Sequence, residues 1–154
     1  GRADLEDASE HLVTIVAGGA LSTIEARTFD DDPGKGLLAV DVGDAIAVVN
    51  THVSFGPRAA GQLAVLATVA RAAPGGAIVM GDFNADASVV RAALGEPLVL
   101  SDLAGQGPTR VGSGGQPGRT IDHIIVLGGA LEDARVLDAA GLSDHNPVAA
   151  TAVF

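Results

Sequence analysis

Four short motifs carry side chains that can move protons or bind anions, and each lies at one end of an apolar run of strand character. A carboxylate can orient or deprotonate water, an amide can donate a hydrogen bond to an anionic oxygen, and an imidazole can exchange a proton near neutral pH. Because α/β proteins present such side chains at strand ends, we expect the motifs to form one catalytic face. In chain order they are Asn50-Thr51-His52, Gly81-Asp82-Phe83-Asn84, Ile121-Asp122-His123 and Ser143-Asp144-His145-Asn146-Pro147.

The elements that must position these motifs are a mixture of strands and helices. Apolar runs predict antiparallel strands over residues 12–17, 37–42 and 45–50, the last two joined by a hairpin turn at Gly43-Asp44. Helical periodicity over residues 58–73 predicts an amphipathic helix, which Pro74-Gly75-Gly76 ends. The pattern is completed by a buried strand over residues 77–80, a short helix over 87–94, strands over 120–127 and 134–138, and a closing segment over 147–154.

Two glycine-rich segments are predicted to be loops. Residues 30–36 favour a solvated turn, with a cation site or a substrate contact as the alternatives. This segment is not a P-loop, because Gly34-Lys35-Gly36 leads into a strand and lacks the Ser or Thr that opens a helix. Residues 105–118, rich in Gly, Pro and Ser, are most simply a mobile loop.

Length and composition predict one domain covering residues 1–154, with a large enough apolar fraction (47%) to bury a core. Cysteine is absent, which excludes disulfides and thiolate metal sites. No apolar stretch reaches the roughly 18 residues that a membrane-spanning helix needs. A cytoplasmic protein and a secreted one whose leader has been removed both remain compatible with the sequence.

The charge balance bears on the partners of the chain. Nine basic residues against 19 acidic ones give a net charge of −10, and the basic residues are scattered. Proteins that grip long duplex DNA cluster Lys and Arg, and those that bind single strands add stacking aromatics. This chain has neither a basic stripe nor any Trp or Tyr, so the composition weighs against processive work on nucleic acid.

With its four motifs in this order, the chain resembles the endonuclease/exonuclease/phosphatase superfamily, whose fold is DNase I-like. The resemblance covers about residues 18–154, and it extends to a glycine-led segment at residues 18–22, to Gln62 and to Thr109. It implies an α/β (α+β) fold in which two mostly antiparallel sheets pack as a sandwich flanked by helices. It also implies a phosphoester substrate, which could be a small molecule, a lipid or a nucleic acid; the acidic composition favours the first two.

The resemblance also implies roles for individual residues in divalent-metal-dependent phosphoester hydrolysis. Asp82 would orient or deprotonate water and Asn84, two residues on in extended backbone, would donate to a phosphate oxygen. Asp122 would hydrogen-bond His145 and fix its tautomer, so that His145 contacts the scissile phosphate. His52, helped by Asn50, would also contact the phosphate, while Asp144 and Asp82 would hold Mg²⁺ or Mn²⁺ weakly as the cofactor.

The family pattern is incomplete at the amino-terminal side. The superfamily carries an Asn on one early strand and a Gln-Glu pair on the next, and the Glu is the main metal ligand. Neither Glu6, Glu10 nor Glu25 has that setting, so we expect the fold to be incomplete at its amino terminus. Missing strands would leave sheet edges open, and a second chain or a dimer could cover them.

Each motif also has a plainer interpretation. Asp82 and Asn84 could cap a simple turn, residues 143–147 could be a capped loop, and residues 50–52 an ordinary strand end. Asp122 could be a buried structural acid, although carboxylates are rarely buried unpaired. His123, on the opposite face from Asp122, is predicted to be structural. Three hypotheses follow for the whole chain: a metal-dependent phosphoesterase, a catalytically inactive relative that binds phosphate ligands, and a split half completed by a partner chain.

Overall fold

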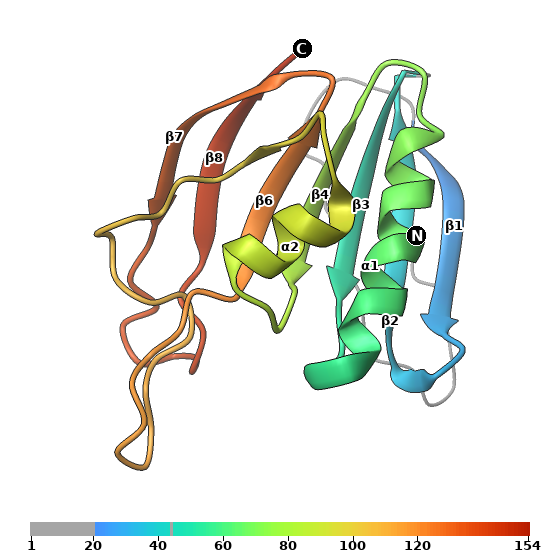
Figure 1. Cartoon of the computed structure of the whole chain (residues 1–154). Helices are drawn as coiled ribbons and strands as arrows, with labels where there is room; N and C mark the ends of the chain where they lie inside the picture. Colours follow the sequence, from blue (N-terminus) through green and yellow to red (C-terminus); the bar gives the residue numbers. More distant parts are fainter. Residues whose placement is uncertain (1–20, 44) are drawn as a thin grey trace.

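The computed structural model describes residues 21–43 and 45–154, so the strand expected over residues 12–17 lies outside the described residues. Its largest feature is a six-stranded sheet in the order β1-β2-β3-β4-β6-β5 (Figure 1). All neighbouring strands run antiparallel except β3 and β4, which are parallel. The strands are β1 (Leu21–Phe29), β2 (Asp32–Val42), β3 (Ile46–His52), β4 (Ala77–Asp82), β5 (Val99–Leu100) and β6 (Asp122–Leu127).

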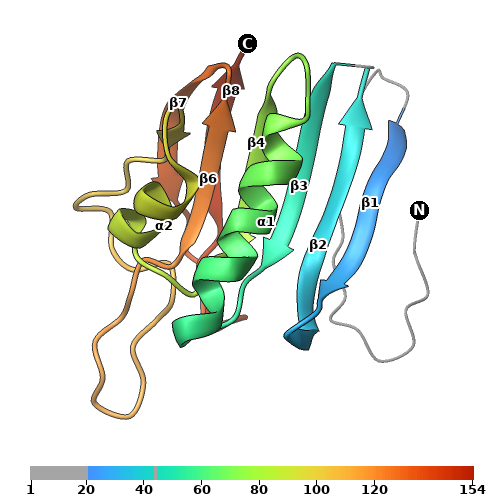
Figure 2. The ribbon, with the colours of Figure 1, turned by 45° about the vertical axis from the view of Figure 1, so that its right-hand side comes forward.

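Two helices and a second, smaller sheet complete the described architecture. The α-helices α1 (Ala59–Arg71) and α2 (Ala87–Leu94) cover one face of the large sheet, and a short 3₁₀ turn, η1 (Gly56–Arg58), leads into α1 (Figure 2). Strands β7 (Ala130–Val136) and β8 (Val148–Val153) form an antiparallel pair, and β8 packs against β6. The predicted fold class, a mixed α+β arrangement of two sheets with flanking helices, is confirmed.

The hydrophobic core lies between the large sheet and its helices. Val49 on β3 and Val79 on β4 face Leu63 and Leu66 of α1, and all four side chains are 0% exposed. Because strand residues alternate between faces, the neighbours Asn50 and Met80 lie on the opposite face of the sheet. The apolar stripe that predicted α1 is therefore the stripe that covers the core face.

The β3-α1-β4 unit accounts for the placement of two motifs. Parallel neighbours need a crossover connection, and α1 provides it. Both strands consequently end at the same edge of the sheet, with His52 the last residue of β3 and Asp82 the last of β4. Helix α2 starts shortly after β4, as expected, and its bounds equal the predicted residues 87–94.

The structure differs from the sequence-based prediction around the first two strands. The expected turn over residues 30–36 is confined to Asp30 and Asp31, because β2 already starts at Asp32. Gly36 belongs to the strand: a Cβ there would lie 2.3 Å from the carbonyl oxygen of Arg27 on β1. The glycines that suggested a loop thus permit a close approach of two strands. Strand β1 runs to Phe29, well beyond the glycine-led strand segment that the resemblance implied at residues 18–22, and only Phe29 of its residues is buried.

Candidate active site

A single row of residues crosses four neighbouring strands of the large sheet. Gly36 on β2 pairs with His52, His52 pairs with Asp82, and Asp82 pairs with Asp122. Residues far apart in sequence therefore meet because of strand register, at the edge where β3 and β4 end and β6 starts. Asp122, like Asp82, lies on the face of the sheet that the helices do not cover, one residue out of phase with buried His123.

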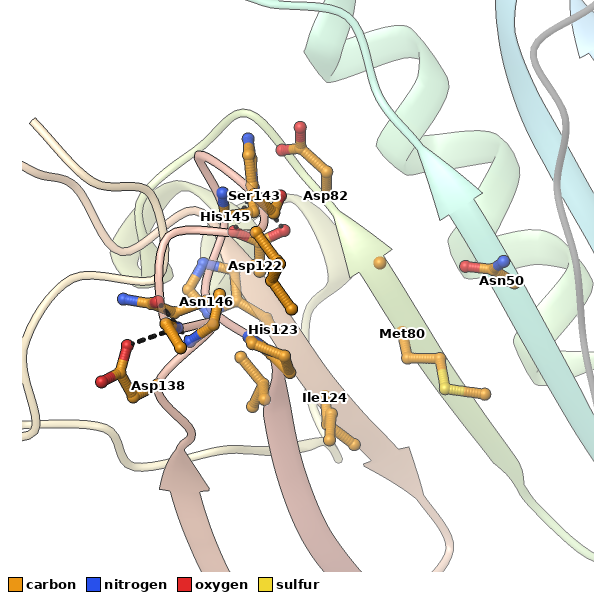
Figure 3. A pocket seen from close by; sticks show the side chains of 16 residues that line it. Asn50, Met80, Asp82, Asp122, His123, Ile124, Asp138, Ser143, His145 and Asn146 are labelled. Carbon is orange, nitrogen blue, oxygen red and sulfur yellow. Dashed lines mark hydrogen bonds and ion pairs between the residues drawn. The ribbon is translucent and has the colours of Figure 1, made fainter. Parts of the chain in front are cut away.

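His145 joins this row through Asp122. Its Nδ1 lies 2.9 Å from Asp122 Oδ2 and 3.1 Å from Oδ1, which is the hydrogen bond expected from the sequence (Figure 3). A carboxylate on Nδ1 orients the ring and directs Nε2 away from Asp122. With both side chains only partly buried, Nε2 is available to a ligand.

Thr109 positions the start of β6. Its side chain is 0% exposed, and its Oγ1 accepts hydrogen bonds from the backbone N–H groups of Ile121 and Asp122, each at 3.0 Å. The backbone N–H of Asn146 in turn donates to the carbonyl of Thr109 at 2.6 Å. One buried threonine thus ties Asp122 to the segment that carries His145. The hydroxyl group that makes these bonds explains why a threonine suits this position.

Asp82 is held by two donors. Its Oδ2 lies 3.2 Å from His52 Nε2, and its Oδ1 accepts the backbone N–H of Asn84 at 2.8 Å. Burial raises the pKa of Asp82, but the hydrogen bonds from His52 and Asn84 and the charges of His52 and His145 outweigh it, so the net pKa lies below the ordinary value of 3.8. Asp82 is therefore a carboxylate at neutral pH, able to accept a proton or bind a cation.

Asn84 does not adopt the extended conformation assumed from the sequence. Its φ is +48°, in the left-handed region, because the chain turns immediately after Asp82. Its side-chain amide donates to the carbonyl of Val53 at 2.8 Å. Asn84 therefore ties the segments following β3 and β4 together, and a contact between its amide and a phosphate oxygen would use its second N–H.

Lys35 is a site residue that the sequence analysis did not single out. Its Nζ lies within hydrogen-bonding distance of both ring nitrogens of His52. Lys35 immediately precedes Gly36, the partner of His52 on β2, so it lies at the same edge of the sheet as His52. Only a correct prediction of where β2 starts could have revealed this contact, since the segment resembles a solvated turn.

Asp82, Asp122 and His145 form a cluster that could hold a divalent cation. One ligand atom from each lies within 4.8 Å of the others. Two carboxylates suit Mg²⁺ or Mn²⁺, which commonly keep several waters and use one or two protein carboxylates. Asp144, a predicted metal ligand, is outside this cluster: its side chain is 71% exposed and its Oδ2 lies 3.8 Å from Arg110 Nε.

The cluster opens onto a cavity of about 670 Å³ on the face of the large sheet opposite the helices. Asn50, Met80 and Ile124 lie along its floor, two residues before or after the site residue on the same strand (Figure 3). The loop over residues 138–147 forms its other side. Asn50 therefore lies next to the site on β3. It lines the cavity but is not part of the Asp82–Asp122–His145 cluster.

Gly81 is required by the close approach of β3 and β4. Its φ is +141°, and a Cβ at this position would lie 1.9 Å from the carbonyl oxygen of Thr51, its partner on β3. Only glycine fits such an approach. The glycine of the Gly-Asp-Phe-Asn motif thus allows His52 and Asp82 to sit side by side.

A buried network fixes the chain just beyond His52. Gln62 on α1 accepts the backbone N–H of Ser54 at 2.7 Å and donates to Asp31 Oδ1 at 2.8 Å. Ser54 Oγ donates to Asp32 Oδ2 at 2.7 Å, and this hydrogen bond is the main reason that the pKa of Asp32 is lowered. The network joins α1, the turn between β1 and β2, and the segment after β3.

His123 is structural, as predicted. It is 2% exposed, its Nε2 donates to the carbonyl of Ala85 at 3.0 Å, and its ring packs at 5.7 Å from Phe83. Burial lowers its pKa below the ordinary value of 6.5, against the opposing effects of the Ala85 hydrogen bond and of nearby carboxylates.

No helix of the described residues is long and apolar enough to cross a membrane.

Several solved structures share this fold at low sequence identity. A truncated TDP2 of Caenorhabditis elegans matches with a TM-score of 0.62 and 15% identity over 88% of this chain and 67% of that one. The 3′-5′ exonuclease NExo of Neisseria meningitidis matches with a TM-score of 0.63 and 19% identity over 87% and 71%. A D. rerio TDP2 complexed with single-strand DNA product gives 0.65 and 14% over 83% and 66%.

The chain is shorter than the proteins it matches. It spans 52% of another C. elegans TDP2 structure and 56% of CdtB, the biologically active subunit of cytolethal distending toxin. Among curated proteins no relative matches significantly. A family model does match, over residues 17–145, which include the first three motifs and the fourth as far as His145. This chain belongs to the endonuclease/exonuclease/phosphatase family.

Proposed function

We propose that the chain carries the phosphoester-hydrolysing face of its family, acting with a divalent cation held by Asp82 and Asp122. The observation that carries this proposal is the cluster of Asp82, Asp122 and His145, assembled within 4.8 Å by strand register and by Thr109. The family comprises endonucleases, exonucleases and phosphatases, which share phosphoester hydrolysis.

The side chains divide the chemistry between them. Asp82, ionised through its hydrogen bonds from His52 and Asn84, orients the attacking water and accepts its proton. His145, fixed by Asp122 on Nδ1, directs Nε2 at a phosphoryl oxygen and stabilises the charge that develops there. His52 and Lys35, which lie on the side of Asp82 away from Asp122, add hydrogen-bond donors for the phosphate.

A bound Mg²⁺ or Mn²⁺ would neutralise phosphoryl charge as a Lewis acid. The residues present fit such an ion, since two partly buried carboxylates converge with lone pairs beyond those that the hydrogen bonds use. Asp144 remains a proposed ligand, which would require its exposed side chain to leave Arg110.

The proposal is tested by hydrolysis of a chromogenic phosphodiester with Mg²⁺, with Mn²⁺ and with EDTA. We expect metal-dependent turnover, which Asp122→Asn and His145→Ala each lower by about 100-fold or more, because the first leaves the imidazole without its orienting carboxylate and the second removes the imidazole. Glu132→Gln, an exposed change on β7, is the matched control and should retain turnover. Equal rates in Asp122→Asn and wild type, at unchanged melting temperature, would remove the Asp-His pair from the mechanism.

A second candidate is a binding module or split half that needs another chain for turnover. The favouring observation is that the described glutamates, Glu25, Glu96 and Glu132, are all absent from the cluster, and Glu25 pairs instead with Arg27 at 2.6 Å. A folded wild-type chain with no turnover in any metal would favour this candidate.

A further inference from the structure

Phe55 is an aromatic side chain exposed beside the site. It is 70% exposed, whereas Phe29 and Phe83 are buried in the core. Arg119 places its guanidinium 5.7 Å from the centre of the Phe55 ring. An exposed ring supported by a guanidinium is a surface on which a flat, conjugated group can stack.

The segment that carries Phe55 is rigid on one side. The preceding residues Val53 and Ser54 are 0% and 3% exposed, and the Gln62 network holds the Ser54 backbone. The exposure of the Phe55 ring is therefore not caused by a mobile backbone before it. A side chain held out on a fixed backbone loses little conformational freedom when a ligand binds it.

The Phe55–Arg119 pair is tied to three of the strand ends that form the site. Phe55 follows His52 by three residues, and Arg119 precedes Asp122 by three. Arg119 also bonds Asp86 at 3.2 Å, four residues after Asp82. Three residues span at most about 11 Å, so the pair lies within the reach of a group bonded to the scissile phosphate.

Electrostatics favour stacking over attraction to a phosphate backbone. Arg119 is paired with Asp86, Arg58 with Asp32 and Arg110 with Asp144, so the arginines around the site are already partly neutralised. The ring is also an unsuitable cage for a quaternary ammonium headgroup, because Arg119 already places a positive charge against it. A nucleobase satisfies both conditions.

We propose that Phe55 and Arg119 form a stacking platform for the nucleobase next to the scissile phosphate, which makes a nucleotide or the end of a single strand the substrate class. This rests on the proposed function only for the position of the phosphate. Sequence composition favoured small or lipid-linked phosphoesters, whereas the geometry of this pair points to a base-bearing one.

The chain offers a direct optical test, since it contains no Trp or Tyr. Phe55→Trp introduces a single indole at the platform, and a single-stranded thymidine oligonucleotide is titrated against it in EDTA, where no turnover occurs. We expect quenching of the indole fluorescence that saturates with oligonucleotide. Phe154→Trp is the matched control: Phe154 packs on Gly76, at the opposite end of β4, and should not be quenched.

Further probes separate stacking from other contacts. Phe55→Leu keeps apolar bulk without a π face and should weaken oligonucleotide binding, measured by anisotropy of a labelled strand, by about 10-fold or more. An abasic oligonucleotide and phosphocholine should leave the Phe55→Trp signal unchanged. Equal quenching by the abasic strand or by phosphocholine, or wild-type affinity in Phe55→Leu, would overturn the platform.

The two proposals fail separately. Quenching without any metal-dependent hydrolysis would leave the platform in place and remove the catalytic proposal. Hydrolysis of the chromogenic diester without base-dependent quenching would do the reverse.

Discussion

Asp122 and His123 are neighbours on β6 whose side chains lie on opposite faces of the large sheet, and their environments differ accordingly. Asp122 meets His145 at the partly open edge, while His123 is buried with its Nε2 on the Ala85 carbonyl. The Nδ1 atom of His123 has no hydrogen-bond partner among the described residues. Protonating this ring would therefore place an additional donor in the core without an acceptor.

The pH dependence of stability should show this. Because the folded pKa of His123 lies below 6.5, the unfolded state binds more protons as the pH falls below 6.5. The free energy of unfolding should therefore decrease from pH 6.5 down to the folded pKa, with a slope of at most about 1.4 kcal/mol per pH unit from this group. Urea unfolding in EDTA measures it.

The matched variant is His123→Gln, which can still donate to the Ala85 carbonyl but does not titrate. It should lack this component, even though Asp122, Asp86 and Asp82 act on the ring in wild type. If the free energy of unfolding depends on pH in the same way in wild type and in His123→Gln, then His123 has the same pKa in the folded and unfolded states.

Individual side chains also mark the limit of what the sequence predicted. The Asp122–His145 hydrogen bond and the structural role of His123 were predictable because an acid-base pair and strand alternation leave few alternatives. The hydrogen bond from the Asn84 amide to the Val53 carbonyl and the contact between Lys35 and His52 were not predictable. Both depend on backbone details, a left-handed residue after β4 and a strand that starts inside a glycine-rich stretch.

At the scale of elements, the β3-α1-β4 unit was the most predictable part because its helix has a clear apolar stripe and its strands are continuous apolar runs. The bounds of exposed strands were less predictable. Strand β1 has few buried residues, and β7 starts at Ala130, four residues before its expected start. Neither strand is buried enough to impose a marked pattern on its sequence.

The contact between β3 and β4 gives a prediction for Gly81. Gly81→Ala should lower the free energy of unfolding by at least about 2 kcal/mol, because the methyl group meets the Thr51 carbonyl at a φ that alanine avoids. Any separation of the strands also moves His52 from Asp82, so hydrolysis should fall. Urea unfolding and the chromogenic assay measure the two effects.

The control is Gly61→Ala on α1, where a Cβ meets nothing within 4 Å. This change should stabilise the protein by up to about 1 kcal/mol, since alanine favours a helix more than glycine does. Similar stability losses in both variants would show that Gly81 is not constrained by β3.

This chain spans between 51% and 71% of the length of the structures it matches. Its described second sheet has two strands, and the cavity beside the site lies on the face of the large sheet opposite α1 and α2.

Assembly of the cluster within one chain nevertheless predicts that a single chain suffices for turnover. The initial rate of phosphodiester hydrolysis per chain should stay constant as protein concentration rises, because Asp82, Asp122 and His145 all come from the same molecule. A rate per chain that increases with concentration, together with a dimer in size-exclusion chromatography, would assign part of the site to a second copy.

The backbone contact that closes the long loop before β6 separates the loop from the residues that carry the site. Arg110 and Arg119 exchange backbone hydrogen bonds of 2.8 and 2.9 Å, and all residues between them are exposed. Thr109 then sets the start of β6 independently of the loop tip. Evolution, or an engineer, can therefore graft a different specificity element between these two arginines while leaving the hydrolytic row in register.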